Sequence, residues 1–205
     1  MSIKQKAIKG VAWSAIQNWG SQVGSLLVFF LLARLLTPEA FGLVALANVF
    51  LLFMQLLLEQ GFSQAIIQRE DLEPEHLNTA FWLTLVSGTL LAGIGIFSAS
   101  WIAELFGQAA LTPIIRWVSP LLIIIALARV QQASLERKFN YKAIAARKIL
   151  ATFMGGAVGV LMAFLGFGVW SLVAQQFVFE SVGAITLWVC SDWRPGLTVS
   201  MRHFR

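Results

Sequence analysis

The chain has 205 residues, of which 58% are hydrophobic and 12% are charged, about half the charged fraction of a typical soluble domain. Its 15 basic and 10 acidic side chains give a net charge of +5, and its mean hydropathy is +0.77. This composition excludes a water-soluble enzyme and a disordered chain, and a single cysteine excludes a secreted disulfide scaffold. We therefore expect an integral membrane protein.

Uncharged runs along the chain predict six transmembrane helices, because a helix needs about 20 mainly apolar residues to cross a bilayer. Four runs lack Asp, Glu, Lys and Arg altogether: 10–33, 40–58, 76–103 and 149–179. The fourth expected span contains Arg116 and Arg129 near its ends, and the sixth contains Glu180. The expected spans of this all-α, polytopic fold are 11–33, 41–59, 79–101, 112–131, 148–167 and 169–190.

The basic residues indicate how these helices are oriented, because Lys and Arg accumulate in cytoplasmic loops. If the N-terminus is cytoplasmic, all of the 15 basic residues except Arg34 and Arg116 fall on the cytoplasmic side. Both termini are therefore expected in the cytoplasm. This topology accounts for the positive net charge, and no nucleic-acid partner is expected.

The sequence lacks the motifs of common catalytic centres. It has no HExxH or GxSxG motif and no His placed to activate a Ser or Cys. Its 2 His and 1 Cys are too few for a structural zinc site. The acidic segment 70–75 is interpreted as the solvated start of a helix rather than a metal site. We expect the protein not to be an enzyme, and we expect no metal or other cofactor.

Polar side chains within the spans are the remaining candidates for function, since such groups face a cavity or a partner. The first helix carries a polar stripe at helical spacing, made of Gln17, Asn18, Ser21, Gln22 and Ser25. The stripe either hydrogen-bonds to a neighbouring helix, with Gly20 and Gly24 allowing close approach, or forms the wall of a hydrophilic path. The sequence leaves both interpretations open.

A carboxylate also lies in the sixth span, where Glu180 follows Gln175 and Gln176. It is expected either to make an interhelical hydrogen bond in its protonated state or to serve a proton or cation relay. The basic segment 137–148 is expected to anchor on the anionic inner leaflet, or alternatively to gather a phosphorylated lipid head group. Tight helix packing is predicted at the glycines of the fifth span, Gly155, Gly156 and Gly159.

Four stretches in register with these spans carry a resemblance to a known family. They are GVAWSA at 10–15, ARLLTPEAFG at 33–42, GFSQAIIQR at 61–69 with NTAFWL at 78–83, and RPGL at 194–197. Together they resemble the N-terminal half of bacterial polysaccharide flippases. These are the O-antigen and colanic-acid type exporters of the multidrug/oligosaccharidyl-lipid/polysaccharide superfamily, and the resemblance covers essentially the whole chain.

The resemblance implies an architecture and an activity. Such proteins move a polyprenyl-pyrophosphate-linked oligosaccharide across the bacterial cytoplasmic membrane by alternating access between two six-helix lobes. Residues 1–205 are then expected to form one lobe of a MATE-like transporter, without its second lobe. The expected partners are the lipid-linked oligosaccharide, membrane lipids, and a missing C-terminal lobe or a second copy. Family-like motifs include Arg34, Glu59, Gln64 and Arg69.

These observations lead to a hypothesis about the site. Arg69, Arg129 and Arg137 are expected to contact the diphosphate first, at the inner face. Sugar hydroxyls are expected to meet a path lined by Gln17, Gln22, Gln175 and Gln176, and Glu180 is expected to sense the coupling ion. Two alternatives remain at this stage: an exporter of small molecules or drugs from the same superfamily, and a non-transporting scaffold of a glycan-assembly complex.

Overall fold

The structure is a computed structural model that describes residues 3–59 and 74–196, with side chains described for 19–59 and 75–196. Every regular element in these segments is an α-helix, which confirms the predicted all-α fold. The helices are α1 (Ile3–Leu35), α2 (Pro38–Glu59), α4 (Pro74–Leu105), α5 (Leu111–Val118), α6 (Leu121–Arg137), α7 (Tyr141–Phe164) and α8 (Val169–Cys190).

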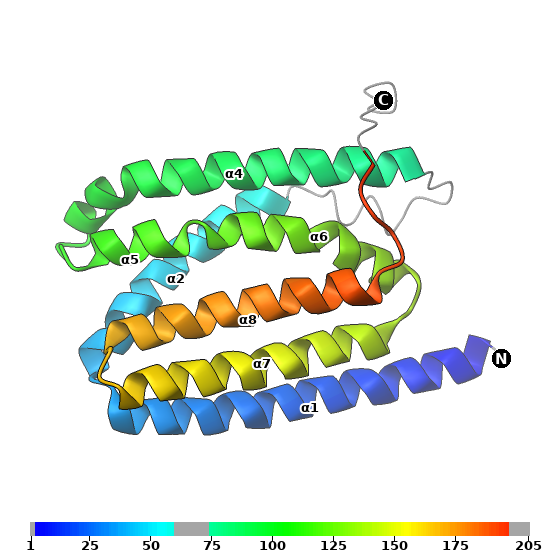
Figure 1. Ribbon diagram of the computed structural model, residues 1–205, viewed down its shortest axis with the longest axis horizontal. Helices are drawn as coiled ribbons and strands as arrows, with labels where there is room; N and C mark the ends of the chain where they lie inside the picture. Colours follow the sequence, from blue (N-terminus) through cyan, green and yellow to red (C-terminus); the bar gives the residue numbers. More distant parts are fainter. Residues whose placement is uncertain (1–2, 60–73, 197–205) are drawn as a thin grey trace.

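The helices run up and down along one bundle axis (Figure 1). Helices α1, α7, α8, α6 and α4 lie side by side in that order, and α2 crosses behind α8, α6 and α5. The start of α1, the α6–α7 connection and the end of α8 lie at one end of the bundle. We call this end the basic end, because Arg137, Lys138 and Lys142 lie on or beside that connection.

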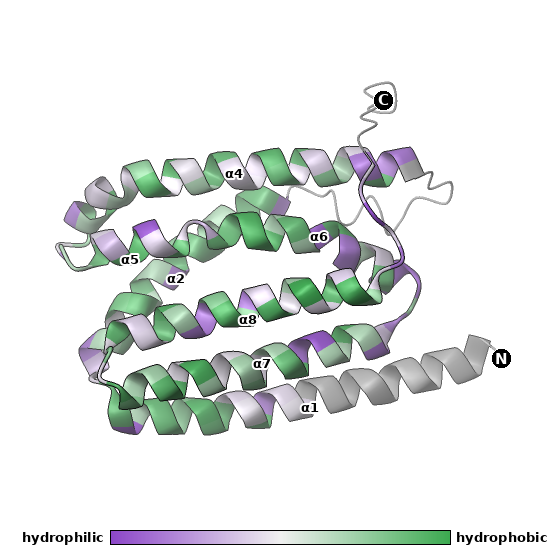
Figure 2. Cartoon of the chain, viewed as in Figure 1, coloured by the Kyte–Doolittle hydropathy of each residue, from purple (hydrophilic) through white to green (hydrophobic). Residues whose placement is uncertain are grey.

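The outer surfaces of the bundle are apolar, as a lipid environment requires. Within the described residues, α2, α4, α5 with α6, α7 and α8 form five segments that are long and apolar enough to cross a membrane, and Trp19–Leu35 is a shorter apolar segment. Large apolar side chains point outward, and Phe97 is 89% exposed. Figure 2 shows hydrophobic residues along all of these helices, with hydrophilic ones concentrated near the basic end. Helices that are apolar on every side are typical of membrane spans.

A proline divides the fourth predicted span into two helices. Pro120 has no backbone N–H and its ring clashes with the carbonyl four residues earlier, so a straight helix cannot continue through it. Helix α5 accordingly ends at Val118 and α6 begins at Leu121. The hydroxyl of Ser119 donates a hydrogen bond to the carbonyl of Ile115 at 2.7 Å, which closes the end of α5. Helix α6 packs between α4 and α8, and α5 contacts α4 and α2.

The segment after α8 is fastened to the start of α4. The backbone N–H of Gly196 donates to the side-chain oxygen of Asn78 at 3.0 Å, and the indole of Trp82 donates to the carbonyl of Gly196 at 2.9 Å. Trp193 stacks edge-on against Phe81 of α4. The first turns of α4 are thereby held to the segment that leaves α8.

Close contact between α4 and α6 depends on a missing side chain at Gly88. A Cβ atom there lies 2.7 Å from the Cβ of Ala126 and 3.0 Å from the carbonyl oxygen of Leu122, too close for either atom. In contrast, nothing lies within 4 Å of a Cβ built at Gly93 on the same helix. The two glycines therefore form a matched pair for a test of helix packing.

We predict that Gly88→Ala lowers the free energy of unfolding by about 1–3 kcal/mol, the usual cost of overpacking. Gly93→Ala is expected to leave it unchanged or to raise it by about 0.5–1 kcal/mol, because alanine favours a helix interior. Unfolding of both variants in detergent micelles measures the difference. Equal stabilities would show that α4 and α6 do not pack as closely as described.

Candidate functional site

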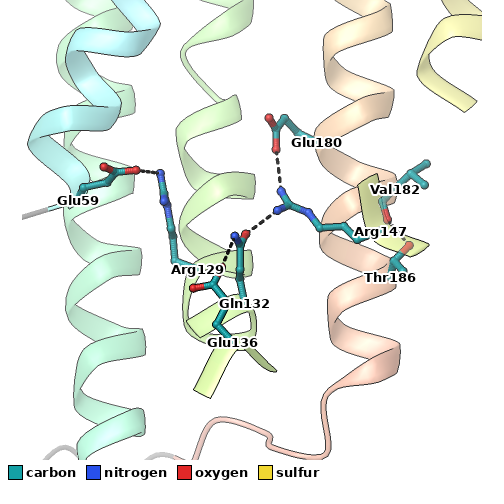
Figure 3. Close-up of polar contacts among 8 residues, drawn as sticks. All are labelled: Glu59, Arg129, Gln132, Glu136, Arg147, Glu180, Val182 and Thr186. Atoms are coloured by element: carbon teal, nitrogen blue, oxygen red, sulfur yellow. Dashed lines mark hydrogen bonds and ion pairs between the residues drawn. The ribbon is translucent and has the colours of Figure 1, made fainter. Parts of the chain in front are cut away.

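An ion pair joins α2 to α6 near the basic end. The guanidinium of Arg129 lies 2.6 Å from a carboxylate oxygen of Glu59, the last residue of α2 (Figure 3). The Arg129 side chain is 23% exposed and Glu59 is 49% exposed. The Nε atom of Arg129 is buried and has no hydrogen-bond partner among the described residues. Arg129 therefore keeps an unused donor inside the bundle.

A second cluster joins α6, α7 and α8 around Arg147. Its guanidinium donates to the amide oxygen of Gln132 and lies 3.7 Å from the carboxylate of Glu180 (Figure 3). The amide nitrogen of Gln132 donates in turn to Glu136 at 2.9 Å. Arg147 and Glu180 are 21% and 18% exposed, so both charges are largely shielded from the surroundings. Arg129 also interacts electrostatically with both of them.

The two clusters form one charged layer that reaches from α2 to α8. Its members are Glu59, Arg129, Gln132, Glu136, Arg147 and Glu180. A charge in an apolar bundle is costly unless it is paired and hydrogen-bonded. Guanidinium groups bind carboxylates and phosphates with matched hydrogen-bond geometry, so the two arginines of the layer are chemically able to hold an anion in place of their carboxylate partners.

Small residues on α7 bring α8 close enough for this layer to form. A Cβ at Gly155 lies 2.9 Å from the backbone oxygen of Gln175, and one at Gly159 lies 2.9 Å from that residue's Cβ. On α8, Gly183 lies under Arg147, whose Nε atom is 3.1 Å from the position of a Cβ. The glycines of the fifth predicted span therefore pack tightly, as the sequence predicts, and Gly183 gives the Arg147 side chain its space.

A pocket of about 430 Å³, mainly apolar but with several polar side chains in its lining, lies between α1, α2, α7 and α8. Its polar lining consists of Ser25, Asn48, Thr152, Gln175 and Gln176, and its aromatic lining consists of Phe29, Phe41 and Phe179. The amide of Gln176 donates to the side-chain oxygen of Asn48 at 3.1 Å, which joins α8 to α2. Amides and hydroxyls beside aromatic rings suit a ligand that has both hydroxyl groups and apolar faces.

The pocket and the charged layer share one side of α8. Gln176 lines the pocket, and Glu180 lies one helical turn further towards the basic end. Residues four apart on a helix occupy the same face. Gln176 and Glu180 therefore connect the pocket to the charged layer along one face of α8.

The structure brings together some of the residues predicted from the sequence and separates others. Gln175 and Gln176 line the pocket, while Arg129, Glu59 and Glu180 belong to the charged layer. Gln22 and Arg34 are exposed on α1, outside the pocket lining, and Arg137 ends α6. Gln64 and Arg69 lie outside the described residues, as does the side chain of Gln17.

Sequence reasoning missed Arg147 as a site residue because it places this arginine in a basic loop. Helix α7 begins at Tyr141, earlier than the expected span 148–167, so Arg147 is a helical residue that faces α8. The side-chain oxygen of Asn140 accepts a hydrogen bond from the backbone N–H of Ala143 at 3.3 Å and starts the helix there. Asn is a favoured N-cap residue, and this was the signal available in the sequence. Asn48 is a polar residue within the uncharged run 40–58, which was a signal in the sequence, although nothing near it indicates its partner Gln176. Gln132 gave no such signal, because it lies just beyond the expected span 112–131.

Comparisons with known proteins agree on one family. The family described as polysaccharide biosynthesis protein matches residues 31–205. The succinoglycan biosynthesis transport protein ExoT of Rhizobium meliloti is 30% identical over 95% of this chain and 40% of its own length. The teichuronic acid biosynthesis protein TuaB of Bacillus subtilis is 24% identical over 100% of this chain and 43% of its own length.

A third relative is the lipopolysaccharide biosynthesis protein WzxC of Escherichia coli, 24% identical over 80% of this chain and 33% of its own length. The chain thus spans about 40% of the length of the curated relatives it matches first. No solved structure matches it significantly.

We predict that Arg147 and Glu180 are energetically coupled. In a double-mutant cycle with Arg147→Gln and Glu180→Gln, the double variant should lose about 1 kcal/mol less stability than the two single variants together, because each single change leaves a shielded charge unpaired. The exposed pair Lys138–Asp192, 3.3 Å apart with side chains 55% and 92% exposed, is the matched control and should show coupling near zero. Unfolding in detergent micelles measures the coupling energy in both cycles. Equal coupling energies for the Arg147–Glu180 and Lys138–Asp192 pairs would contradict the shielding of Arg147.

Proposed function

This chain belongs to the polysaccharide biosynthesis protein family, and from that premise we propose that it forms the N-terminal lobe of an exporter of lipid-linked oligosaccharide. The exporter moves a polyprenyl-pyrophosphate-linked glycan across the bacterial cytoplasmic membrane for surface polysaccharide assembly. One observation carries the proposal: a pocket with amides and hydroxyls in its lining lies one turn of α8 away from a layer that contains two arginines. A lipid-linked sugar diphosphate has both kinds of group, hydroxyls and an anion.

The proposed roles follow the chemistry of the residues. Arg69, Arg129 and Arg137 make the first contacts with the diphosphate at the inner face of the membrane. The amides of Gln175 and Gln176 bind sugar hydroxyls in the pocket, and Asn48 joins them through its hydrogen bond to Gln176. Gln17 and Gln22 of α1 are proposed to bind hydroxyls elsewhere along the path. Glu180 senses the coupling ion, because a carboxylate within a membrane-spanning helix is suited to bind and release a proton or another cation.

The lobe works with a second lobe by alternating access. Transporters of this kind hold their substrate between two repeats that rock against each other, so one lobe supplies half of the site. The pocket lies between α1 and α2 on one side and α7 and α8 on the other. A C-terminal lobe or a second copy then closes over it. The start of α1 and the end of α8 both face the cytoplasm.

We predict that the basic end is cytoplasmic, because Lys and Arg are retained on that side. In a Cys190→Ser background, Lys138→Cys at the basic end should react with a membrane-impermeant maleimide only after spheroplasts are opened. Gln108→Cys, in the turn at the opposite end, should react in intact spheroplasts. The reverse labelling pattern would show that the topology is inverted. The basic end would then lie on the opposite side of the membrane from the cytoplasm, where the substrate is made.

We also predict that a strain without this protein accumulates lipid-linked oligosaccharide and lacks surface polysaccharide. The wild-type gene should restore export, whereas Arg69→Gln, Arg129→Gln and Gln176→Leu should each lower it about tenfold, the effect of losing about 1.4 kcal/mol of binding energy. Glu180→Gln should remove the dependence of export on the ion gradient. Thin-layer analysis of labelled lipid-linked sugars measures accumulation.

Gln108→Leu and Arg116→Gln serve as controls for these variants, since both residues are exposed and lie away from the pocket and the charged layer. Normal export with Arg69→Gln and Arg129→Gln, at normal protein abundance, would contradict the diphosphate assignment. Loss of surface polysaccharide without accumulation of lipid-linked sugar would instead indicate a scaffold.

A further inference from the structure

Arg147 differs from the other described arginines in how it is held. Gln132 and Glu180 contact its guanidinium from two other helices, and Gly183 leaves room for its side chain against α8. Its distance to Glu180 is 3.7 Å, longer than the 2.6 Å between Arg129 and Glu59. The side chain is thus positioned by several groups, but its carboxylate partner is not at close hydrogen-bonding distance.

We propose that Arg147 is a phosphate-binding residue whose guanidinium exchanges the Glu180 carboxylate for the phosphate of a membrane-borne ligand. The inference rests on the proposed function, which brings an isoprenoid diphosphate to this end of the bundle. A phosphate offers several oxygens to the planar guanidinium, which binds it through two parallel hydrogen bonds. Gln132 and Gly183 act as positioning residues, because they orient the guanidinium without contacting the phosphate.

The charges around Glu180 link this exchange to a proton. Glu180 pairs with Arg147 of α7, which also donates to Gln132 of α6, and Gln132 hydrogen-bonds to Glu136. Arg129 of α6 pairs with Glu59 of α2, and its charge also acts on Glu180. Fully ionised, the layer holds two arginines against three glutamates, so it already carries one negative charge in excess. A phosphate that binds here adds further negative charge and displaces the Glu180 carboxylate from Arg147.

The excess is relieved when Glu180 takes up a proton from the aqueous side. The ion pair with Arg147 is then lost, the guanidinium is free for phosphate, and the protonated carboxyl keeps a hydrogen-bonding role. Binding of phosphate and uptake of the proton therefore favour each other, as linkage between two sites requires. When the phosphate leaves, Arg147 returns to Glu180 and the proton is released.

Binding of a defined probe tests this exchange. Full-length protein is purified from its host and placed in phosphatidylcholine nanodiscs, and the Kd of farnesyl diphosphate is measured by calorimetry. Arg147→Gln should raise the Kd at least tenfold. Glu180→Gln should lower it about threefold or more, because the competing carboxylate is gone. The wild-type Kd should fall as the pH is lowered, and the slope should be weaker in Glu180→Gln, whose remaining slope reports titration of the probe itself.

The opposite signs of the two variants separate an exchange site from an ion pair that only stabilises the bundle. If both variants weaken binding alike, or if Arg147→Gln binds as tightly as the wild type, the proposal is wrong. Arg116→Gln is the control, since its guanidinium contacts Ser100 at the other end of the bundle and should leave the Kd unchanged. Where Arg147→Gln fails to fold, Arg147→Lys keeps the charge but loses the paired hydrogen bonds and should raise the Kd severalfold.

Further arms identify the source of the phosphate. Inorganic pyrophosphate that binds as tightly as farnesyl diphosphate assigns the site to a free anion, and weaker binding assigns it to an isoprenoid diphosphate. Competition by phosphatidylglycerol assigns it to a lipid head group. In each case the proposal stands only if binding depends on Arg147. The proposed function is tested separately from this binding site. If the deletion strain accumulates no lipid-linked sugar, the proposed function is wrong, whatever the Kd values are.

Discussion

The energetic cost of charge inside an apolar bundle is the constraint on which this structure depends. An ionised side chain loses its hydration there, and the loss is offset only by an opposite charge or hydrogen bonds at close range. Arg129 of α6 pairs with Glu59 of α2, and Arg147 of α7 pairs with Glu180 of α8. The ion pairs therefore add charge complementarity to the apolar contacts that hold α6, α7 and α8 together near the basic end.

Side-chain volume sets how closely those helices approach. Gly155 and Gly159 let α7 lie against the backbone and side chain of Gln175, and Gly183 admits the stem of Arg147. In a membrane, lipid is as apolar as the helix surface, so close packing and polar contacts replace the hydrophobic effect as the main attraction between helices. The same close approach places Gln176 in the pocket and Glu180 beside the arginine. These glycines therefore determine both how closely α7 packs against α8 and where the side chains of the site lie.

The pocket extends this arrangement towards a partner. It is lined by α1 and α2 as well as by α7 and α8, and the one described hydrogen bond across it joins Asn48 to Gln176. The chain spans about 40% of the length of relatives that take part in succinoglycan transport and teichuronic acid biosynthesis. In the exporter proposed above, the amides of the pocket and the arginines near it form one half of a site that lies between two repeats.

The sequence by itself determined the class of the protein and the positions of its long helices, because uncharged runs of membrane-spanning length admit no other structure. It also indicated Glu180, Gln175 and Gln176, since polar groups are conspicuous in an apolar span. Only the tertiary structure decided that Arg129 pairs with Glu59, that Asn140 begins a helix early enough to turn Arg147 towards α8, and that Gln22 lies outside the pocket lining. These outcomes depend on which helix faces are in contact, and local periodicity carries no information about a partner that is distant in the chain.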